Sequence, residues 1–290
     1  MQSNTPSDSG SSNVMKSLFS VMAMVIAFII AFLIYAYVFG AKSNFIFDEK
    51  GHSEPIAEGM GHWYATVYQG GFIVPIIMGL LIIVITFAIE RALTIARATG
   101  TGNMDNFLKR VKLQLSNGDL NAAIAECDKQ KGSVGNVIKS GLVRYKQVME
   151  DNSMDKDEKL VAIQKELEEA TTLELPMLEK NLTIIATIAS IATLMGLLGT
   201  VLGMIRAFSA LAATGAPDAS QLSTGIAEAL INTAFGIGTS ALAIVLYNSF
   251  TSSIDSLTYR IDEAGFTIAQ NFAAYYHKKE RVNNKEVVAA

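Results

Sequence analysis

Residues 223–250 read S-T-G-I-A-E-A-L-I-N-T-A-F-G-I-G-T-S-A-L-A-I-V-L-Y-N-S-F, a run that is long and apolar enough to cross a membrane as a helix. The run holds a single carboxylate, that of Glu228. A carboxylate near or inside an apolar span costs roughly 2 to 3 kcal/mol on insertion scales, and such a residue usually faces a cavity or a partner. Glu228 is therefore a candidate functional residue. The alternative interpretation is that Glu228 lies at the outer headgroup level and only caps the start of the helix.

The other polar residues of this run also fall on defined faces of the helix. At 100° per residue, Glu228, Asn232 and Thr239 share one face. Thr233 and Ser240 form a second strip more than a quarter-turn away. The helix is therefore predicted to be polar in stripes, which indicates specific neighbours for each stripe.

Composition also indicates a membrane protein. Half of the 290 residues are hydrophobic, the mean hydropathy is +0.33, and charged residues make up 17% of the chain, against about 25% in a typical soluble domain. The net charge of -4, with no basic run that has interleaved aromatic residues, gives no indication of nucleic-acid binding. The sequence has no Walker A loop, no zinc-binding helix with paired histidines and no nucleophile elbow. We therefore predict no enzyme activity, no cofactor and no metal site.

Three further apolar runs, at 17–41, 70–91 and 181–206, predict three more membrane helices. The first run carries no charged residue, and at 1.5 Å per residue it is about 37 Å long, enough to span a bilayer with tilt. A cleaved signal peptide is the alternative because Lys16 precedes this run, although the run exceeds the usual length of about 7 to 15 apolar residues. Residues 42–69 are predicted as a polar loop that ends in aromatic residues suited to a membrane interface.

Residues 92–180 differ from the spans because they are rich in charge and show the periodicity of amphipathic helices. They predict a small helical domain, in which Asp105 and Asp119 are N-caps. Pro176 predicts a kink or a break before the third span.

The distribution of positive charge predicts the orientation. Of the 23 lysines and arginines, only Lys42, Lys50 and Arg206 fall on one side of the spans. By the positive-inside rule, both termini and the helical domain are cytoplasmic. Arg206 ends the third span on the outer side, where it is expected to pair with Asp218 or to extend to the headgroups.

We therefore predict an all-α integral membrane protein with four transmembrane helices and a cytoplasmic helical domain between the second and third. The predicted segments are a disordered cytoplasmic N-terminus (1–16), a first span (17–41), a periplasmic loop (42–69), a second span (70–91), the helical domain (92–180), a third span (181–206), a second periplasmic loop (207–222), a fourth span (223–254) and a cytoplasmic C-terminal helix and tail (255–290).

The third span is more polar than the first two. It carries Thr193 and Thr200, and Gly199 and Gly203 have the spacing of a small-xxx-small helix contact. Each hydroxyl could simply bond back to its own helix. The clustering predicts a helix that packs against other helices rather than against lipid.

Residues 195–205 read M-G-L-L-G-T-V-L-G-M-I and are followed by Phe208, which resembles the G-L-L-G-T-V-x-G-M-I-x-x-F signature of the ExbB/TolQ branch of the ExbB/TolQ/MotA proton-channel family. Residues 225–234, G-I-A-E-A-L-I-N-T-A, resemble the next helix of that branch, and residues 115–124 resemble its helical domain. The resemblance covers roughly residues 70–270.

The resemblance implies a homopentamer in the bacterial inner membrane. The last two membrane helices of each chain would surround two copies of a single-span, ExbD/TolR-like partner with a protonatable aspartate. Ion flow would then energise a TonB- or Tol-type envelope process, indirectly through a TonB/TolA-like protein. By motif alignment, the family's pore-facing threonines fall on Thr200 and Thr233, and its membrane glutamate falls on Glu228. Further candidates for pore lining or helix packing are Asn232, Thr193, Gly199, Gly203 and Thr239.

The usual member of this branch has three spans, so the helix at 17–41 is an extra one, on which the resemblance says nothing. Four spans also resemble MotA-like flagellar or gliding stator subunits, which remain an alternative. A secondary transporter would need discontinuous helices or an inverted repeat, which the spans do not show. A membrane scaffold would leave Glu228 and the hydroxyl cluster unexplained.

Overall fold

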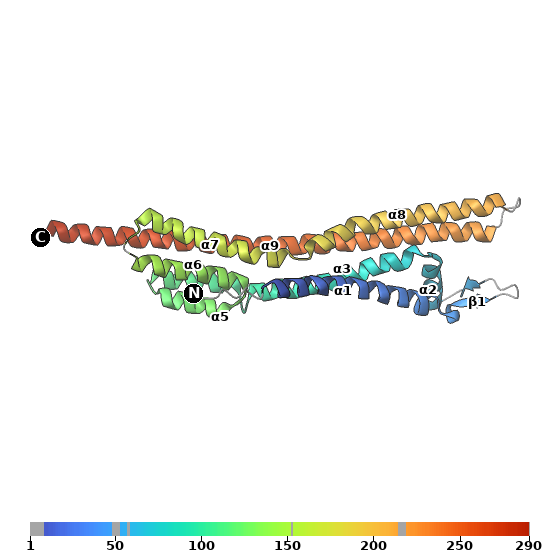
Figure 1. Ribbon diagram of the computed structural model, residues 1–290, viewed down its shortest axis with the longest axis horizontal. Helices are drawn as coiled ribbons and strands as arrows, with labels where there is room; N and C mark the ends of the chain where they lie inside the picture. The colour runs from blue at the N-terminus through green and yellow to red at the C-terminus, as the bar shows by residue number, and fades with distance from the viewer. Residues whose placement is uncertain (1–8, 48–52, 57–58, 152, 214–218, 290) are drawn as a thin grey trace, which may run out of the picture. The chain divides into compact units, whose positions relative to one another are not determined.

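The computed structural model describes residues 9–47, 53–56, 59–151, 153–213 and 219–289. Almost all of these residues are helical, which confirms the predicted all-α class (Figure 1). Four helices are long and apolar enough to cross a membrane, as predicted. The chain divides into two compact units, which we call the membrane unit (1–88 and 183–247) and the helical unit (89–182 and 248–290).

The membrane unit is built from the apolar runs and from the short elements that follow the first of them. Its elements are α1 (Ser9–Leu33), the π-helical turn η1 (Ile34–Phe39), the 3-10 turn η2 (Lys42–Asn44), β1 (Phe45–Phe47), β2 (Ser53–Pro55), α2 (Met60–Gln69), most of α3 (Ile73–Thr99), nearly all of α8 (Leu182–Ala213) and the first part of α9 (Ala219–Ala289).

The segment predicted as a polar loop at 42–69 is largely ordered in its described part. Strands β1 and β2 form a two-stranded antiparallel hairpin, and α2 follows. The ring of Phe39 stacks on Tyr64 of α2, and the ring of Phe45 meets the edge of Tyr68. These aromatic contacts order elements too short to stand out in a scan for long apolar or amphipathic runs.

Several helices are longer than predicted. Helix α1 already begins at Ser9, within the stretch predicted as disordered at 1–16, of which residues 1–8 lie outside the described part. Helix α8 continues to Ala213, beyond the predicted end at 206. Helix α9 runs to Ala289 with no break at the predicted boundary after 254. Each added residue of an existing helix gains a hydrogen bond without a new nucleation step, so helices extend until a breaker stops them.

The N-terminal helix α1 packs on α3 through small side chains. Ala27 and Ala31 are buried, and the ring of Phe28 lies against Gly79, where an added Cβ would overlap the ring. The apolar cluster around Ala31 also takes in Ile231 of α9. The extra helix is therefore joined to both neighbours inside the membrane unit.

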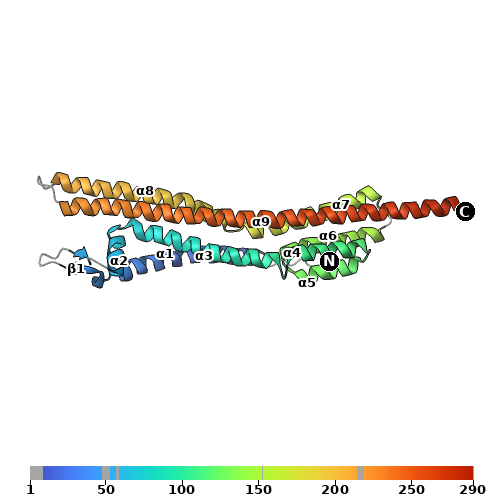
Figure 2. The ribbon, with the colours of Figure 1, turned by 180° about the vertical axis from the view of Figure 1, so that it is seen from behind.

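Helices α8 and α9 pack as antiparallel neighbours through their glycines (Figures 1 and 2). A Cβ added at Gly203 would lie 2.7 Å from the Gly225 carbonyl oxygen, and one at Gly196 would lie 3.0 Å from the Asn232 carbonyl oxygen. Gly199 faces the side chain of Asn232 with no room for a Cβ. The two backbones therefore approach as closely as small residues allow.

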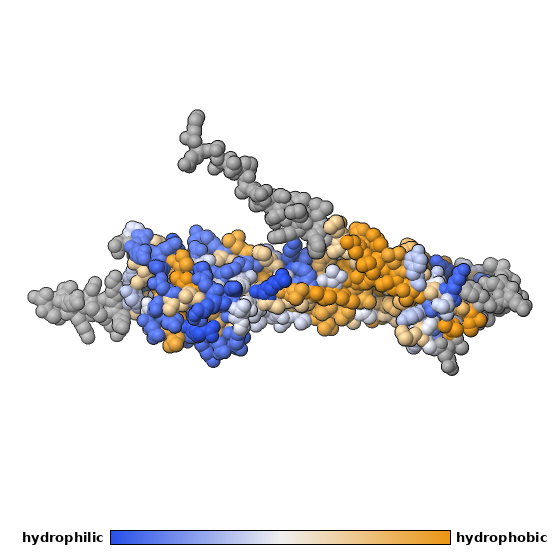
Figure 3. Space-filling model, turned by 90° about the horizontal axis from the view of Figure 1, so that it is seen from below, coloured by the Kyte–Doolittle hydropathy of each residue, from blue (hydrophilic) through white to orange (hydrophobic). Residues whose placement is uncertain are grey.

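The helical unit has the predicted amphipathic pattern. Its helices are α4 (Met104–Ser116), α5 (Leu120–Gln130), α6 (Gly132–Glu150) and α7 (Lys156–Glu179), together with the ends of α3 and α9. The predicted apolar stripes are buried at Phe107, Val111, Leu115, Val134, Val137, Ile138 and Leu142, while Leu108 is only partly buried. Figure 3 shows a mostly hydrophilic surface over this unit and a broad hydrophobic surface over the membrane unit.

The helix caps agree with the prediction in part. Asp119 caps α5 by accepting a hydrogen bond from the Ala122 N–H at 2.8 Å, as predicted. The cap of α4 is Asn103, which accepts from the Asn106 N–H at 3.1 Å, and Asp105 lies in the first turn instead. Asparagine and aspartate are nearly equal as N-caps. Because Asn103 and Asp105 lie so close together, the sequence alone does not decide which of them caps α4.

Pro176 does not end its helix. Helix α7 continues through Pro176 to Glu179, and the break comes at Asn181, whose φ is +66°. A proline removes one hydrogen bond but need not stop a helix, whereas a left-handed residue does, and asparagine is among the few that adopt this conformation readily.

A buried arginine ties the end of α3 to the end of α7. The Nη1 of Arg91 donates to the carbonyl oxygens of Met177 and Leu178, each at 3.1 Å, and its Nε donates to Glu90 Oε2 at 2.6 Å. The Nδ2 of Asn181 donates to the same carboxylate at 3.2 Å. Because the last carbonyls of a helix lack partners within the helix, the guanidinium serves as the C-terminal cap of α7.

Candidate functional site

Glu228 of α9 forms an ion pair with Arg206 of α8. The Arg206 Nη1 lies 2.6 and 2.8 Å from the two carboxylate oxygens. The side chain of Glu228 is 6% exposed and that of Arg206 is 60% exposed. The sequence predicted Asp218 or the headgroups as the partner of Arg206, and Asp218 lies outside the described residues. The pairing with Glu228 follows from the antiparallel α8–α9 packing, which brings positions 206 and 228 level.

A glycine turn between α2 and α3 covers this ion pair. Gly71 has a φ of +70°, and a Cβ added there would lie 2.6 Å from Glu228 Oε1 and 3.3 Å from Arg206 Nη1. The fully buried Asn232 donates through Nδ2 to the Gly70 carbonyl at 2.8 Å and to the Glu228 carbonyl at 3.0 Å. Its Oδ1 has no hydrogen-bond partner among the described residues. The turn, α8 and α9 therefore meet at Glu228.

Thr200 and Thr233 lie together at a different place on the α8–α9 contact. Their hydroxyls hydrogen-bond to each other, and Thr233 also donates to the Ala229 carbonyl at 3.0 Å. Glu228 and Thr233 are about 140° apart around α9, at 100° per residue. The three residues predicted for the ion pathway thus occupy two sites, a hydroxyl pair and a buried ion pair.

The other predicted polar residues are also placed separately. Thr193 is exposed and lines a cavity of about 340 Å³ with Ser190, Ser240 and Tyr247, whereas Thr239 is buried on another face of α9. Gly199 and Gly203 lie in the α8–α9 contact, against α9. Sequence reasoning missed Tyr247 and the glycine turn at 70–71. Tyr247 follows Thr233 and Ser240 at steps of seven residues, so it lies on the same face of α9 as these two residues. This spacing could have identified Tyr247 from the sequence.

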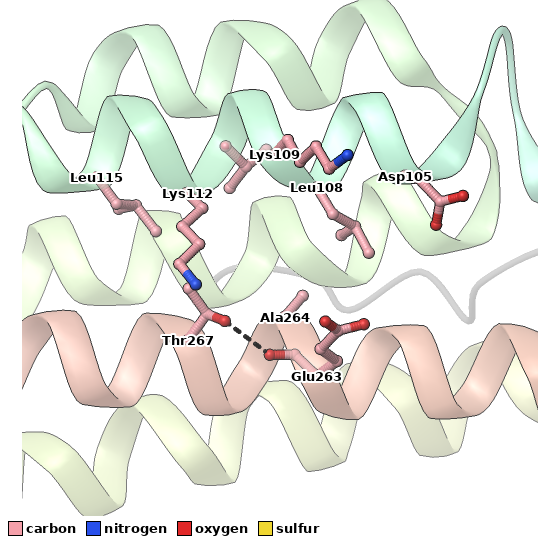
Figure 4. Close-up of a pocket in the computed structure, with 9 residues that line it drawn as sticks. Asp105, Leu108, Lys109, Lys112, Leu115, Glu263, Ala264 and Thr267 are labelled. Atoms are coloured by element: carbon pink, nitrogen blue, oxygen red, sulfur yellow. Dashed lines mark hydrogen bonds between the residues drawn. The ribbon is translucent and has the colours of Figure 1, made fainter.

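The helical unit has a groove of about 480 Å³ between α4 and α9 (Figure 4). It is lined by Asp105, Leu108, Lys109, Val111, Lys112, Leu115, Glu263, Ala264 and Thr267. Apolar side chains alternate here with charges of both signs. Within the part of the chain that the structure describes, no three His, Cys, Asp or Glu side chains lie together as metal ligands would.

The helical unit contains the one cysteine of the chain. Burial raises the pKa of the Cys127 thiol to about 12. Nucleophilic cysteines have a lowered pKa, because the thiolate is the reactive form. Cys127 therefore packs as a small apolar residue.

Comparison with known proteins agrees with the sequence resemblance. Residues 130–263 match the model of the MotA/TolQ/ExbB proton channel family. The chain is 30% identical over 146 residues to the Tol-Pal system protein TolQ of Pseudomonas aeruginosa, which is 50% of this chain and 62% of that protein. It is 42% identical over 88 residues to a protein of Synechocystis sp. named as an ExbB-like biopolymer transport protein, which is 30% of this chain and 42% of that protein. The matches thus span less than two thirds of either relative.

The matched residues contain α6, α7, α8, Glu228 and the Thr200–Thr233 pair, whereas α1, the hairpin, α2 and the glycine turn precede them. Both relatives carry TolQ or ExbB in their names. Residues 130–263 are therefore similar to the MotA/TolQ/ExbB proton channel family, and the names of both relatives agree with a resemblance to its ExbB/TolQ branch.

Proposed function

We propose that this protein is the ring-forming subunit of an ion-driven motor in the bacterial inner membrane. The observation that carries the proposal is the hydrogen-bonded pair of Thr200 and Thr233, placed between two glycine-packed helices of the membrane unit. Hydroxyls inside a span are costly against lipid and serve where a polar path or a partner meets them.

The surface of the α8–α9 hairpin supports assembly into a ring. Leu194, Leu197 and Phe208 of α8 and Leu230 and Val245 of α9 are each more than half exposed. Two helices cannot enclose a path by themselves, so further copies are needed to surround one. The number five is carried over from the family resemblance.

The partner in this proposal is a single-span, ExbD/TolR-like subunit present in two copies. The process is of the TonB or Tol type, reached through a TonB/TolA-like protein. The energy source is the ion gradient, worth about 2.3 kcal/mol per charge for each 100 mV. Unbroken helices through the α8 and α9 spans support this proposal over a secondary transporter, whose substrate sites use discontinuous helices.

The test of function is ion flux in vesicles that contain the chain and its partner. Thr200→Val with Thr233→Val keeps the side-chain shape and removes both hydroxyls, so we expect flux to fall to background while native mass measurement still gives five copies of 31.2 kDa with two partner chains. Thr86→Val, which loses only a bond to its own helix, is the matched control. Full flux through the double variant, or an active monomer, contradicts the proposal.

The proposed orientation, with both termini and the helical unit in the cytoplasm, has a separate test. In a Cys127→Ser background, Ile46→Cys should react with an impermeant thiol reagent on whole cells, and Lys131→Cys should not. Reaction of Lys131→Cys from outside contradicts this orientation.

A further inference from the structure

The charge on Glu228 depends on one exposed neighbour. Its carboxylate is almost fully buried, and Arg206 is its ion-pair partner among the described residues. A buried carboxylate without a cation takes up a proton, because the charged form is poorly solvated. The position of the Arg206 guanidinium therefore sets whether Glu228 is ionised.

The glycine turn fixes the position of both groups. The backbone at Gly71 leaves no space for a side chain on the side of Glu228 and Arg206. Asn232 holds the neighbouring carbonyl of Gly70 to α9 at 2.8 Å. A methyl group added at position 71 would therefore displace the carboxylate, the guanidinium or both.

The N-terminal helix reaches this turn through Tyr35. The Tyr35 hydroxyl donates to the Tyr68 carbonyl at 2.9 Å, and the two rings stack with centroids 4.8 Å apart. The same carbonyl accepts the Gly71 N–H at 3.2 Å. The Tyr68 carbonyl thus links the side chain of Tyr35 to the backbone turn that covers the ion pair.

We propose that Arg206, Gly71 and Tyr35 are positioning residues for Glu228, and that α1, through its continuation η1 and the turn at 68–71, sets the ionisation of this carboxyl group. The inference deepens the proposed function and rests on it. Arg206 from α8 is the charged group paired with Glu228 in the described chain, and Tyr35 from η1 and Tyr68 from α2 are titratable side chains that contact each other at the neighbouring turn. Of these, only Arg206 carries charge near neutral pH.

In this arrangement, the helix that lies outside the family-matched residues acts as a control element. When Tyr35 holds Tyr68, the turn keeps its place beside the ion pair, and Arg206 stays on Glu228. When the contact loosens, Arg206 is free to turn toward the solvent, and Glu228 takes up a proton. Assembly or partner contacts on α1 would then change the protonation of Glu228 without touching it.

The test measures protonation of Glu228 directly. A hydrophobic carbodiimide modifies protonated carboxyl groups in apolar surroundings, and peptide mass mapping of the full chain in vesicles locates the adduct. Glu228→Gln identifies the Glu228 adduct by its loss. We expect Arg206→Gln to speed labelling by about tenfold or more, because a buried carboxylate without a cation favours its protonated form. Arg206→Lys should restore slow labelling, because it restores the cation.

Matched variants test the link to α1. Gly71→Ala should speed labelling, whereas Gly59→Ala, with a φ of +91° and nothing within 4 Å of an added Cβ, should not. Tyr35→Phe loses only the hydroxyl and should speed labelling by about twofold, since a neutral hydrogen bond is worth about 1 kcal/mol and only part of it reaches the turn. Tyr37→Phe, at a tyrosine that is 76% exposed, should leave the rate unchanged.

Each result tests one part of the proposal. Unchanged labelling in Arg206→Gln overturns Arg206 as the positioning residue, and equal rates in Tyr35→Phe and Tyr37→Phe overturn the role of α1. The labelling rates do not depend on ion flux. The proposed function is therefore contradicted only by the flux and native mass measurements on the Thr200 and Thr233 variants.

Discussion

The two units each contain an arginine–glutamate pair, and the pairs are buried in opposite senses. In the helical unit Arg91 is 2% exposed and Glu90 is 37% exposed, whereas in the membrane unit Glu228 is 6% and Arg206 is 60% exposed. A guanidinium does not lose its proton in a protein, so a buried Arg91 must keep its partners at all times. A buried carboxylate becomes neutral when its partner leaves. Burial of the arginine makes a fixed cap, and burial of the glutamate makes a group that can change its charge.

The largest effect on stability is expected from the buried arginine. Arg91→Met leaves the Glu90 carboxylate and the carbonyls of Met177 and Leu178 without their donor, and breaking such a buried pair costs about 3 to 5 kcal/mol. Thermal unfolding of the purified full chain measures the loss. Arg110→Met, at an arginine that is half exposed, should cost less than about 1 kcal/mol. Similar losses of stability in Arg91→Met and Arg110→Met would contradict the distinction between a buried and an exposed arginine.

The next prediction compares the two glutamates. Glu228→Gln fills the same space but cannot exchange a proton, so ion flux in vesicles should be lost while the ring stays assembled. Glu90→Gln should keep its flux, because Glu90 accepts hydrogen bonds from Arg91, Asn181 and Thr94 within the helical unit. Full flux in Glu228→Gln would make Glu228 a packing or capping group.

A smaller effect is expected at the asparagine beside the fixed pair. Asn181→Ala places an alanine at a φ of +66° and removes the bond to Glu90, for a loss of about 1 to 2 kcal/mol. Asn181→Gly loses the same bond but adopts this φ without a steric cost. Thermal unfolding should therefore rank Asn181→Gly above Asn181→Ala, and the reverse order would show that the backbone conformation is not the reason for this asparagine.

The smallest effect concerns an exposed pair of the helical unit. Hydrogen bonds from Lys129 and then Arg110 hold the pKa of Glu126 below its ordinary value of 4.5. A lowered folded-state pKa adds stability above pH 4.5, which is lost as the pH falls through the folded-state value. Glu126→Gln should lose this contribution at pH 7 and, in consequence, this part of the acid sensitivity. Equal acid sensitivity of Glu126→Gln and the parent would assign no role to these bonds.

The periodicity and composition of the sequence were enough to predict the four apolar helices, the buried stripes of α4 and α6 and the cap at Asp119. These features depend on neighbours within a few residues. The pairing of Arg206 with Glu228 depends on the level at which two helices meet, and the cover at Gly71 depends on a segment more than 150 positions away. Neither the ion pair nor the glycine cover leaves a pattern in the nearby sequence. The stripe on α9 did indicate that Glu228 and Asn232 share a neighbour, but it could not say that the neighbour is a backbone turn.

The glycine contact between α8 and α9 also sets which substitutions this hairpin tolerates. At Gly199 and Gly203 the space for a Cβ is already taken by Asn232 or by backbone, and at Gly196 a Cβ would lie 3.0 Å from the Asn232 carbonyl oxygen, so even alanine strains this contact. Leu194, just before them, and Leu197, between the first two, point outward and are each 59% exposed. A library that replaces every residue from 194 to 205 should therefore show intolerance in steps of three and four, with permissive positions between them. The substitutions that separate Thr200 from Thr233, and those that abolish viability of the cells, should fall at the same positions.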